Sequence, residues 1–132
     1  MGEVLSARTE RLLLWWRTQT GRETATEYLD ALAMALRPQG WRFVRYYRPE
    51  EFLVPLPLLW VYASGGEDIG IVVNVLATPG GMWAYHEAQR GRRGYLHPCG
   101  DVEAAAAVLD DLLRHRVSVA AFRGRRQARL GR

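Results

Sequence analysis

The spacing of apolar residues changes from a helical to a strand-like period near position 40. Residues 1–17 and 23–36 carry helical patterns, and Gly21 between them predicts a break. The same stretch also fits one long helix over 6–36. Residues 12–16 are too apolar to face water on any side. We expect them to pack against the sheet on one side and against a partner or the second helix on the other.

Five strand-like segments follow, and most are separated by turns rich in glycine. They span residues 41–48, 58–63, 69–77, 82–89 and 95–99. Pro55 and Pro57 predict a loop over 49–57, because proline cannot donate a hydrogen bond to a neighbouring strand. Short turns join antiparallel neighbours, so the pattern predicts a meander of four or five strands.

The last regular element is a helix that starts after Asp101, a good N-cap residue, and runs to about residue 116. From about residue 120 onward we expect disorder. The order of elements predicts an α+β fold: an N-terminal helix or helical pair, an antiparallel meander, and a C-terminal helix packed on one sheet face. We expect a single domain over 1–119 and a basic tail over 120–132.

Segments 58–63 and 69–77 are apolar on both faces, although a sheet with one face in water should alternate apolar and polar residues. Helices can cover only one face, so the other needs a second cover. A homodimer interface is the favoured cover, and a bound ligand, a partner protein or a folded-over N-terminal helix are the alternatives. Asn74 should face the less tightly packed side and find a hydrogen-bond partner there.

Composition indicates an ordinary globular protein. The chain has 132 residues, of which 48% are hydrophobic and 24% charged, which suits one folded domain and excludes disorder of the whole chain. The apolar runs are too short to span a bilayer. Cys99 is the single cysteine, and the first residues lack a secretory signal pattern. We therefore expect a cytoplasmic protein that does not associate with a membrane.

The positive charge is concentrated at the C-terminal end. All 18 basic residues are arginine, and five of them follow residue 116 with no acid among them, which gives +5. The rest of the chain carries 13 arginines against 14 acids, which gives −1. Such a tail resembles a nonspecific phosphate-binding arm, although a solvated tail without that role is favoured. The candidate nucleic-acid residues are Arg123, Arg125, Arg126 and Arg129.

Potentially reactive side chains are concentrated between residues 82 and 99. If the turn at 91–94 has an even number of residues, His86 opposes Cys99, and His97 shares their face. A thiol beside a histidine could be an activated nucleophile, and three N/S ligands could hold zinc. An odd turn would place Glu87 opposite Cys99 and remove the cluster. Since neither C-x-x-C nor H-E-x-x-H occurs, we favour a structural role and expect no cofactor or metal.

Aromatic residues on two strands are candidates for binding. Trp60 and Tyr62 lie on one predicted strand, and Trp83 and Tyr85 on another. Sheets that display aromatic side chains can stack nucleic-acid bases. The sequence has no RNP-like motif, so core packing or a dimer contact is the favoured interpretation.

One stretch resembles a group of small proteins. It consists of a W-x-Y sequence at 83–85, a basic glycine-containing turn, and P-C-x-D at 98–101 followed by an alanine-rich helix. This pattern resembles small uncharacterised α–β–α proteins of high-GC bacteria, and the resemblance implies the same order of meander and helix. The helix–sheet–helix order is also similar to secretion-chaperone-like dimers, as an analogy of fold alone.

These observations predict a non-enzymatic interaction module, a homodimer that binds a protein or small ligand through its second sheet face. The binding candidates are Trp60, Tyr62, Asn74, Trp83 and Tyr85. One alternative is a nucleic-acid-associated regulator that uses the arginine-rich tail. Another is a small thiol- or zinc-dependent enzyme. Patterns for a P-loop, a dinucleotide fold, a nucleophile elbow and an EF-hand are absent from the sequence, which removes the commonest nucleotide, hydrolase and calcium functions.

Overall fold

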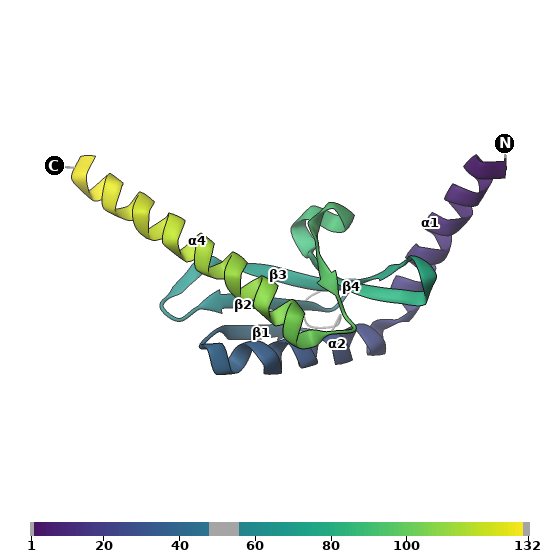
Figure 1. Cartoon of the computed structure of the whole chain (residues 1–132), viewed down its shortest axis with the longest axis horizontal. Helices are drawn as coiled ribbons and strands as arrows, with labels where there is room; N and C mark the ends of the chain where they lie inside the picture. Colours follow the sequence, from purple (N-terminus) through teal and green to yellow (C-terminus); the bar gives the residue numbers. More distant parts are fainter. Residues whose placement is uncertain (1, 48–55, 131–132) are drawn as a thin grey trace.

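The computed structural model describes residues 2–47 and 56–130, and within them the side chains of 7–47, 56–65 and 69–125. Its helices are α1 (Gly2–Thr20), α2 (Arg22–Leu36) and α4 (Val102–Leu130), with short 3-10 turns η1 (Arg37–Gln39), η2 (Pro79–Gly81) and η3 (Ala88–Gly94). The strands are β1 (Arg42–Tyr46), β2 (Leu58–Ala63), β3 (Gly66–Thr78), β4 (Met82–Glu87) and β5 (Tyr95–Pro98). They form one antiparallel sheet in the order β1-β2-β3-β4-β5 (Figure 1). The predicted α+β fold is confirmed.

The N-terminal part forms two helices, which settles the alternative of one long helix. Gly21 separates them, and its backbone lies against the Trp83 ring so closely that a Cβ atom would overlap it. Only a residue without a side chain allows this contact. The break therefore comes from packing against the sheet as well as from the low helix propensity of glycine.

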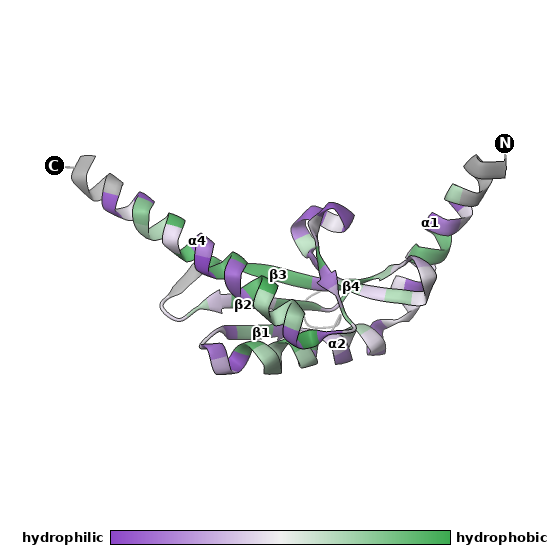
Figure 2. Ribbon diagram, in the orientation of Figure 1, coloured by the Kyte–Doolittle hydropathy of each residue, from purple (hydrophilic) through white to green (hydrophobic). Residues whose placement is uncertain are grey.

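The main core lies between the sheet and the helices α2 and α4. Paired residues of an antiparallel sheet share a face, and the pairs Leu59↔Val73, Val61↔Ile71 and Val75↔Tyr85 supply the buried side. The helices contribute Leu29, Leu32 and Leu36 from α2 and Ala105, Ala106, Leu109 and Leu113 from α4. Each fully buried aliphatic or aromatic side chain stabilises the fold by about 1.5–3 kcal/mol. Figure 2 shows the matching concentration of hydrophobic residues along β3.

The opposite sheet face is divided into two regions. Trp60, Tyr62 and Val72 are half-buried there, whereas Asn74 and His86 are buried. Both α1 and η3 contact β3, which carries Asn74, and η3 also contacts β4, which carries His86. The N-terminal helix that the sequence offered as one alternative cover therefore does contact the sheet, but it leaves the Trp60 region only half-buried.

Some predicted boundaries were wrong. The strand expected over 82–89 ends at Glu87, and the expected turn at 91–94 is part of η3, where Gly91 has a positive φ of 58°. Most of the loop predicted over 49–57 lies outside the described residues. Among the helices of the described chain, none is long and apolar enough to cross a membrane.

The C-terminal helix begins as predicted and extends further than predicted. Asp101 Oδ1 accepts the N–H of Ala104 at 3.1 Å, as an N-cap does. The helix then continues to Leu130, so the segment expected to be disordered from about residue 120 is helical to that residue. Arginine and alanine are strong helix formers, no proline occurs in this segment, and Gly124 alone does not end the helix.

Two helical ends project beyond the sheet. We call residues 2–16 the α1 arm and residues 117–130 the α4 arm. In Figure 1, α2 lies below the sheet, and the two arms rise above it at opposite ends. Between them η3 rises on the same side of the molecule.

Candidate functional site

The structure does not bring His86, His97 and Cys99 together as one cluster. A register shift after Tyr85 pairs Tyr85 with His97 and His86 with Tyr95, so the two histidines lie on opposite faces of the sheet. Cys99 belongs to the main core and donates its N–H to the Trp83 carbonyl at 3.0 Å. Nowhere in the described residues do three His, Cys, Asp or Glu side chains form a group that could hold a metal ion. The even register on which the cluster depended is wrong.

The surroundings of these groups also oppose reactivity. Burial raises the pKa of the Cys99 thiol to about 12, so the thiol stays protonated at neutral pH. Burial lowers the pKa of His86, and the nearby Arg92 lowers it further, whereas its contact with the Ala84 carbonyl acts in the opposite direction. Neutral His86 packs edge-on against Tyr95, with 5.5 Å between the ring centroids. These are the features of packed side chains.

The four candidate aromatic residues lie on two different faces. Trp60 and Tyr62 stack on the half-buried face, with their centroids 4.7 Å apart and their planes at 35°. Tyr85 lies fully buried on the helix face, where its hydroxyl donates to the Tyr28 carbonyl at 2.6 Å. Trp83 lies on that same face beside Gly21. A common aromatic platform is therefore not formed, although Trp60 and Tyr62 remain together.

Asn74 lies on the second sheet face, and the described residues do not supply the hydrogen-bond partner that was predicted for it. It is 7% exposed and sits directly opposite His86 on the second sheet face. Its Oδ1 is buried and accepts no hydrogen bond from the described residues. A buried acceptor left without a donor costs about 1–3 kcal/mol.

Among the described side chains, the largest group of exposed apolar neighbours lies on the α1 arm. Trp15 and Trp16 are each 59% exposed, Leu12 70% and Leu13 55%, whereas Leu14 is buried. A shallow groove on the arm is lined by Leu12 and Trp15 together with the stems of two arginines. The sequence marked this run as too apolar for solvent. It did not place the run among the site residues, because helix periodicity alone cannot show that the helix extends past the sheet.

Polar contacts hold the α1 arm at its base. Beyond the end of β2, the edge of β3 has no neighbouring strand among the described residues, and Thr18 Oγ1 accepts the N–H of Ala77 there at 3.0 Å. Arg17 donates to the carbonyls of Thr78 and Met82, each at 2.9 Å, and its guanidinium lies 5.2 Å from the centre of the Trp83 ring. We call Arg17 and Thr18 the α1 root.

Polar contacts also hold the α4 arm, near the other end of β3. Arg116 donates to the Gly70 carbonyl at 3.0 Å and to Glu87 Oε1 at 2.9 Å. The Glu87 side chain is only 9% exposed, so this ion pair is partly shielded from water. Arg116, the α4 root, therefore joins α4 to both β3 and β4.

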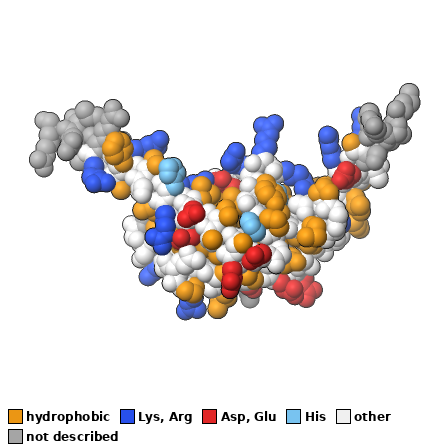
Figure 3. All heavy atoms as spheres, viewed as in Figure 1, with side chains coloured by type: hydrophobic (Ala, Val, Ile, Leu, Met, Phe, Trp, Pro, Cys, Tyr) orange, Lys and Arg blue, Asp and Glu red, His pale blue; other side chains and the backbone are white. Residues whose placement is uncertain are grey.

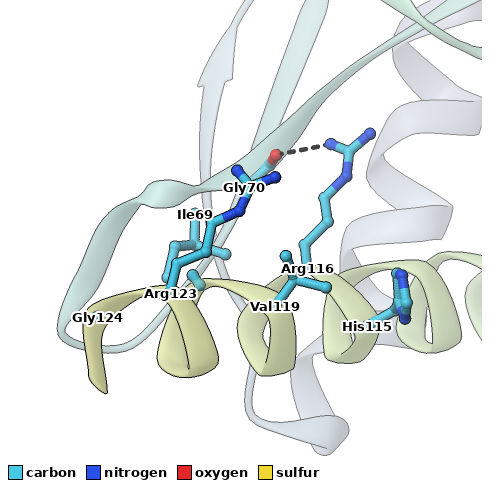
Figure 4. A pocket seen from close by; sticks show the side chains of 8 residues that line it. Ile69, Gly70, His115, Arg116, Val119, Arg123 and Gly124 are labelled. Carbon is cyan, nitrogen blue, oxygen red and sulfur yellow. Dashed lines mark hydrogen bonds between the residues drawn. The ribbon is translucent and has the colours of Figure 1, made fainter. Parts of the chain in front are cut away.

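An open groove lies beside the α4 root (Figure 4). It has a volume of about 620 Å³ and is lined by Ile69, Gly70, His115, Arg116, Val119, Ala120, Arg123 and Gly124. Figure 4 shows the Arg123 side chain reaching back along the groove toward Gly70. The predicted tail residues Arg123 and Arg125 are exposed on the α4 arm, and the side chains of Arg126 and Arg129 lie outside the described residues.

Comparison of the chain with protein-family models, with curated proteins and with solved structures finds no match.

Proposed function

We propose that the protein is a non-enzymatic interaction module that works as a cytoplasmic homodimer. The observation that carries the proposal is the α1 arm, where four neighbouring large apolar side chains are 55–70% exposed. Contiguous apolar surface of this kind marks interaction sites on proteins. The hydrogen bonds of Arg17 and Thr18 hold the base of the arm in place, so the patch is presented on a fixed support.

The exposed apolar area of the α1 arm favours a second copy of the chain as its binding partner. The four side chains expose roughly 500 Å² of apolar surface, given about 150–250 Å² for a whole aromatic side chain. A twofold dimer buries the same patch from both chains, which doubles this area. The total of roughly 1,000 Å² reaches the lower bound for a specific interface. Tryptophan is also enriched at the energetic centres of such interfaces.

The second sheet face is the proposed site for a protein or small ligand. Trp60 and Tyr62 offer a stacked, half-buried aromatic surface there. Asn74 lies on the same face, but its Oδ1 is buried, so Trp60 and Tyr62 carry this part of the proposal. An enzymatic function has less support, because the histidines lie on opposite faces and the Cys99 thiol is buried with a raised pKa.

Light scattering coupled to gel filtration tests the dimer. The wild-type chain should elute with a mass of about 30 kDa, twice the 15.0 kDa of one chain. The variant Trp16→Glu should elute as a monomer, because a charge in the apolar patch opposes burial. Phe122→Glu is the matched control, since Phe122 is 63% exposed on the other arm, and it should stay dimeric.

Circular dichroism of both variants checks that they remain folded. A wild-type mass of 15 kDa across the whole concentration range would overturn the dimer. Equal loss of the dimer in Phe122→Glu would show that the α1 arm is not the contact.

A further inference from the structure

The charges of α4 and η3 are separated along the molecule. Residues 101–111, which cap and begin α4, carry four acids and no base, whereas residues 112–125 carry four arginines and no acid. The η3 turn carries three more arginines, again without an acid. In Figure 3 many arginine side chains stand along the upper edge, over the arms and η3, and most acidic side chains lie lower. The helix dipole favours this order only within the first and last turns of a helix, so it does not account for mid-helix charges.

The arginines of this region fall into two groups. Arg92 donates to the Ala77 carbonyl at 2.8 Å, Arg116 holds Gly70 and Glu87, and Arg114 pairs with Asp110 on its own helix. The other group is exposed, and its side chains make neither a hydrogen bond nor an ion pair within the part of the chain that the structure describes. Its members are Arg90, Arg93, Arg123 and Arg125.

The first group fixes the second in space. Glu87 is the last residue of β4 and directly precedes η3, so its ion pair with Arg116 ties the base of η3 to the α4 root. Arg92 ties η3 to β3 as well. These contacts hold η3 and α4 in fixed positions relative to each other. The exposed arginines of η3 and of the α4 arm therefore lie on one connected support, and their guanidinium groups face solvent.

The groove beside the α4 root lies at the start of this surface. An anion that enters it would lie beside Arg123, in a groove whose lining also includes His115, Ile69 and Val119. The guanidinium fork matches two oxygens of a phosphate. A row of separated phosphates fits cations spread over two elements better than a single small anion does. A membrane surface fits less well, because η3 has no large apolar side chain to insert, and Phe122 is the single large apolar side chain that is exposed among the described side chains of the α4 arm.

We propose that η3 and the α4 arm form a surface that binds the phosphate backbone of a nucleic acid, without reading its sequence. Arg90, Arg93, Arg123 and Arg125 would each contact a phosphate. This surface is separate from the α1 arm, so it does not depend on the proposed dimer.

Fluorescence anisotropy with a labelled random duplex of about 20 base pairs tests the surface, using salt between about 50 and 200 mM. Four phosphate contacts per chain predict a slope of about −3.6 for log K against log salt. Removing two of them, by Arg90→Gln with Arg93→Gln or by Arg123→Gln with Arg125→Gln, should halve that slope. The control is Arg37→Gln with Arg42→Gln, which removes the same charge near β1 and should leave the slope unchanged.

Three results would overturn the proposal: absence of duplex binding at the lowest salt, an equal loss of slope in the control, or binding to anionic lipid vesicles without binding to the duplex. Light scattering on each variant measures its molar mass and so shows separately whether it is a dimer. A failure of the nucleic-acid surface is therefore distinguishable from a failure of the dimer.

Discussion

The α1 arm and the α4 arm leave the sheet near opposite ends of β3, and each is rooted by an arginine that donates to backbone carbonyls of the sheet. Arg17 serves the first arm and Arg116 the second. The arms differ in what they present: the α1 arm exposes tryptophan and leucine, and the α4 arm exposes arginine. A shared anchoring device can therefore support two chemically different surfaces.

The two roots also differ in how they are supported. In the α1 root, Arg17 contacts two carbonyl groups and the Trp83 ring, all of which are neutral. In the α4 root, Arg116 forms an ion pair with the largely buried carboxylate of Glu87. Loss of Arg116 leaves the buried carboxylate of Glu87 without its ion-pair partner. Loss of Arg17 leaves only neutral carbonyl groups without a donor. Changes at the α4 root should therefore be the more damaging ones.

The largest effect is expected at Gly70, the partner of the α4 root. A Cβ atom there would overlap the Val61 carbonyl and lie 2.9 Å from Trp60 Nε1. Since the backbone of a central strand cannot move away, Gly70→Ala should lower the free energy of unfolding by about 3 kcal/mol, as severe overpacking does. Gly124→Ala is the control on the α4 arm, where nothing lies within 4 Å of a new Cβ. It should raise the stability by about 0.5–1 kcal/mol.

Urea unfolding measures both glycine variants. A loss below about 1 kcal/mol for Gly70→Ala would mean that the sheet adjusts around Gly70 and that its interior is not rigid.

The next effect compares the two root arginines directly. Breaking a buried ion pair costs about 3–5 kcal/mol, and because Arg116 is 33% exposed we expect about 2 kcal/mol for Arg116→Met. Arg17→Met should cost about 1 kcal/mol, the value of lost hydrogen bonds to carbonyls that water can reach. The double variant Arg116→Met with Glu87→Gln should recover most of the loss, since the stranded charge is removed.

Chemical denaturation of the three variants decides this comparison. Equal losses for the two single variants, or no recovery in the double variant, would show that Glu87 is not the cause of the difference.

The smallest effect concerns His86, which lies in the sheet between the two roots. Burial lowers its pKa below the ordinary value of 6.5, so near pH 6 the unfolded chain binds more protons than the folded one. The stability contributed by neutral His86 is therefore complete above about pH 6.5 and is lost as the pH falls toward its folded pKa. Urea midpoints at pH 7.5 and 5.5 should differ in the wild type and differ less in His86→Gln, with His115→Gln on the exposed face of α4 as control. An equal pH dependence in His86→Gln would remove this residue as the cause.

The sequence carried enough information for the fold because its periodic signals are local. The glycine-rich turns separated strands, and Asp101 marked the start of α4, where its side chain caps the helix. Register is a longer-range property. The shift after Tyr85 that separated the two histidines depends on how η3 folds, and a turn of seven residues has many conformations.

The arms were also beyond local reasoning. The run at 12–16 was recognised as too apolar for water, but its exposure depends on where α1 meets β3. The α4 arm was expected to be disordered because its charge resembles that of a solvated tail. Helix propensity and the contacts of Arg116 outweigh that composition.

The strand β3 sets the distance between the two surfaces. Its contact with Arg116 is at Gly70 and its contact with Arg17 is at Thr78, eight residues further along. At about 3.4 Å per residue, the two attachment points are roughly 27 Å apart. Successive residues of a strand face opposite sides, so this distance can change only in steps of two residues if both arms are to keep their orientation. The length of β3 between Gly70 and Thr78 thus sets the separation of the two arms, and insertions or deletions of two residues would change that separation while keeping both arms on the same side of the sheet.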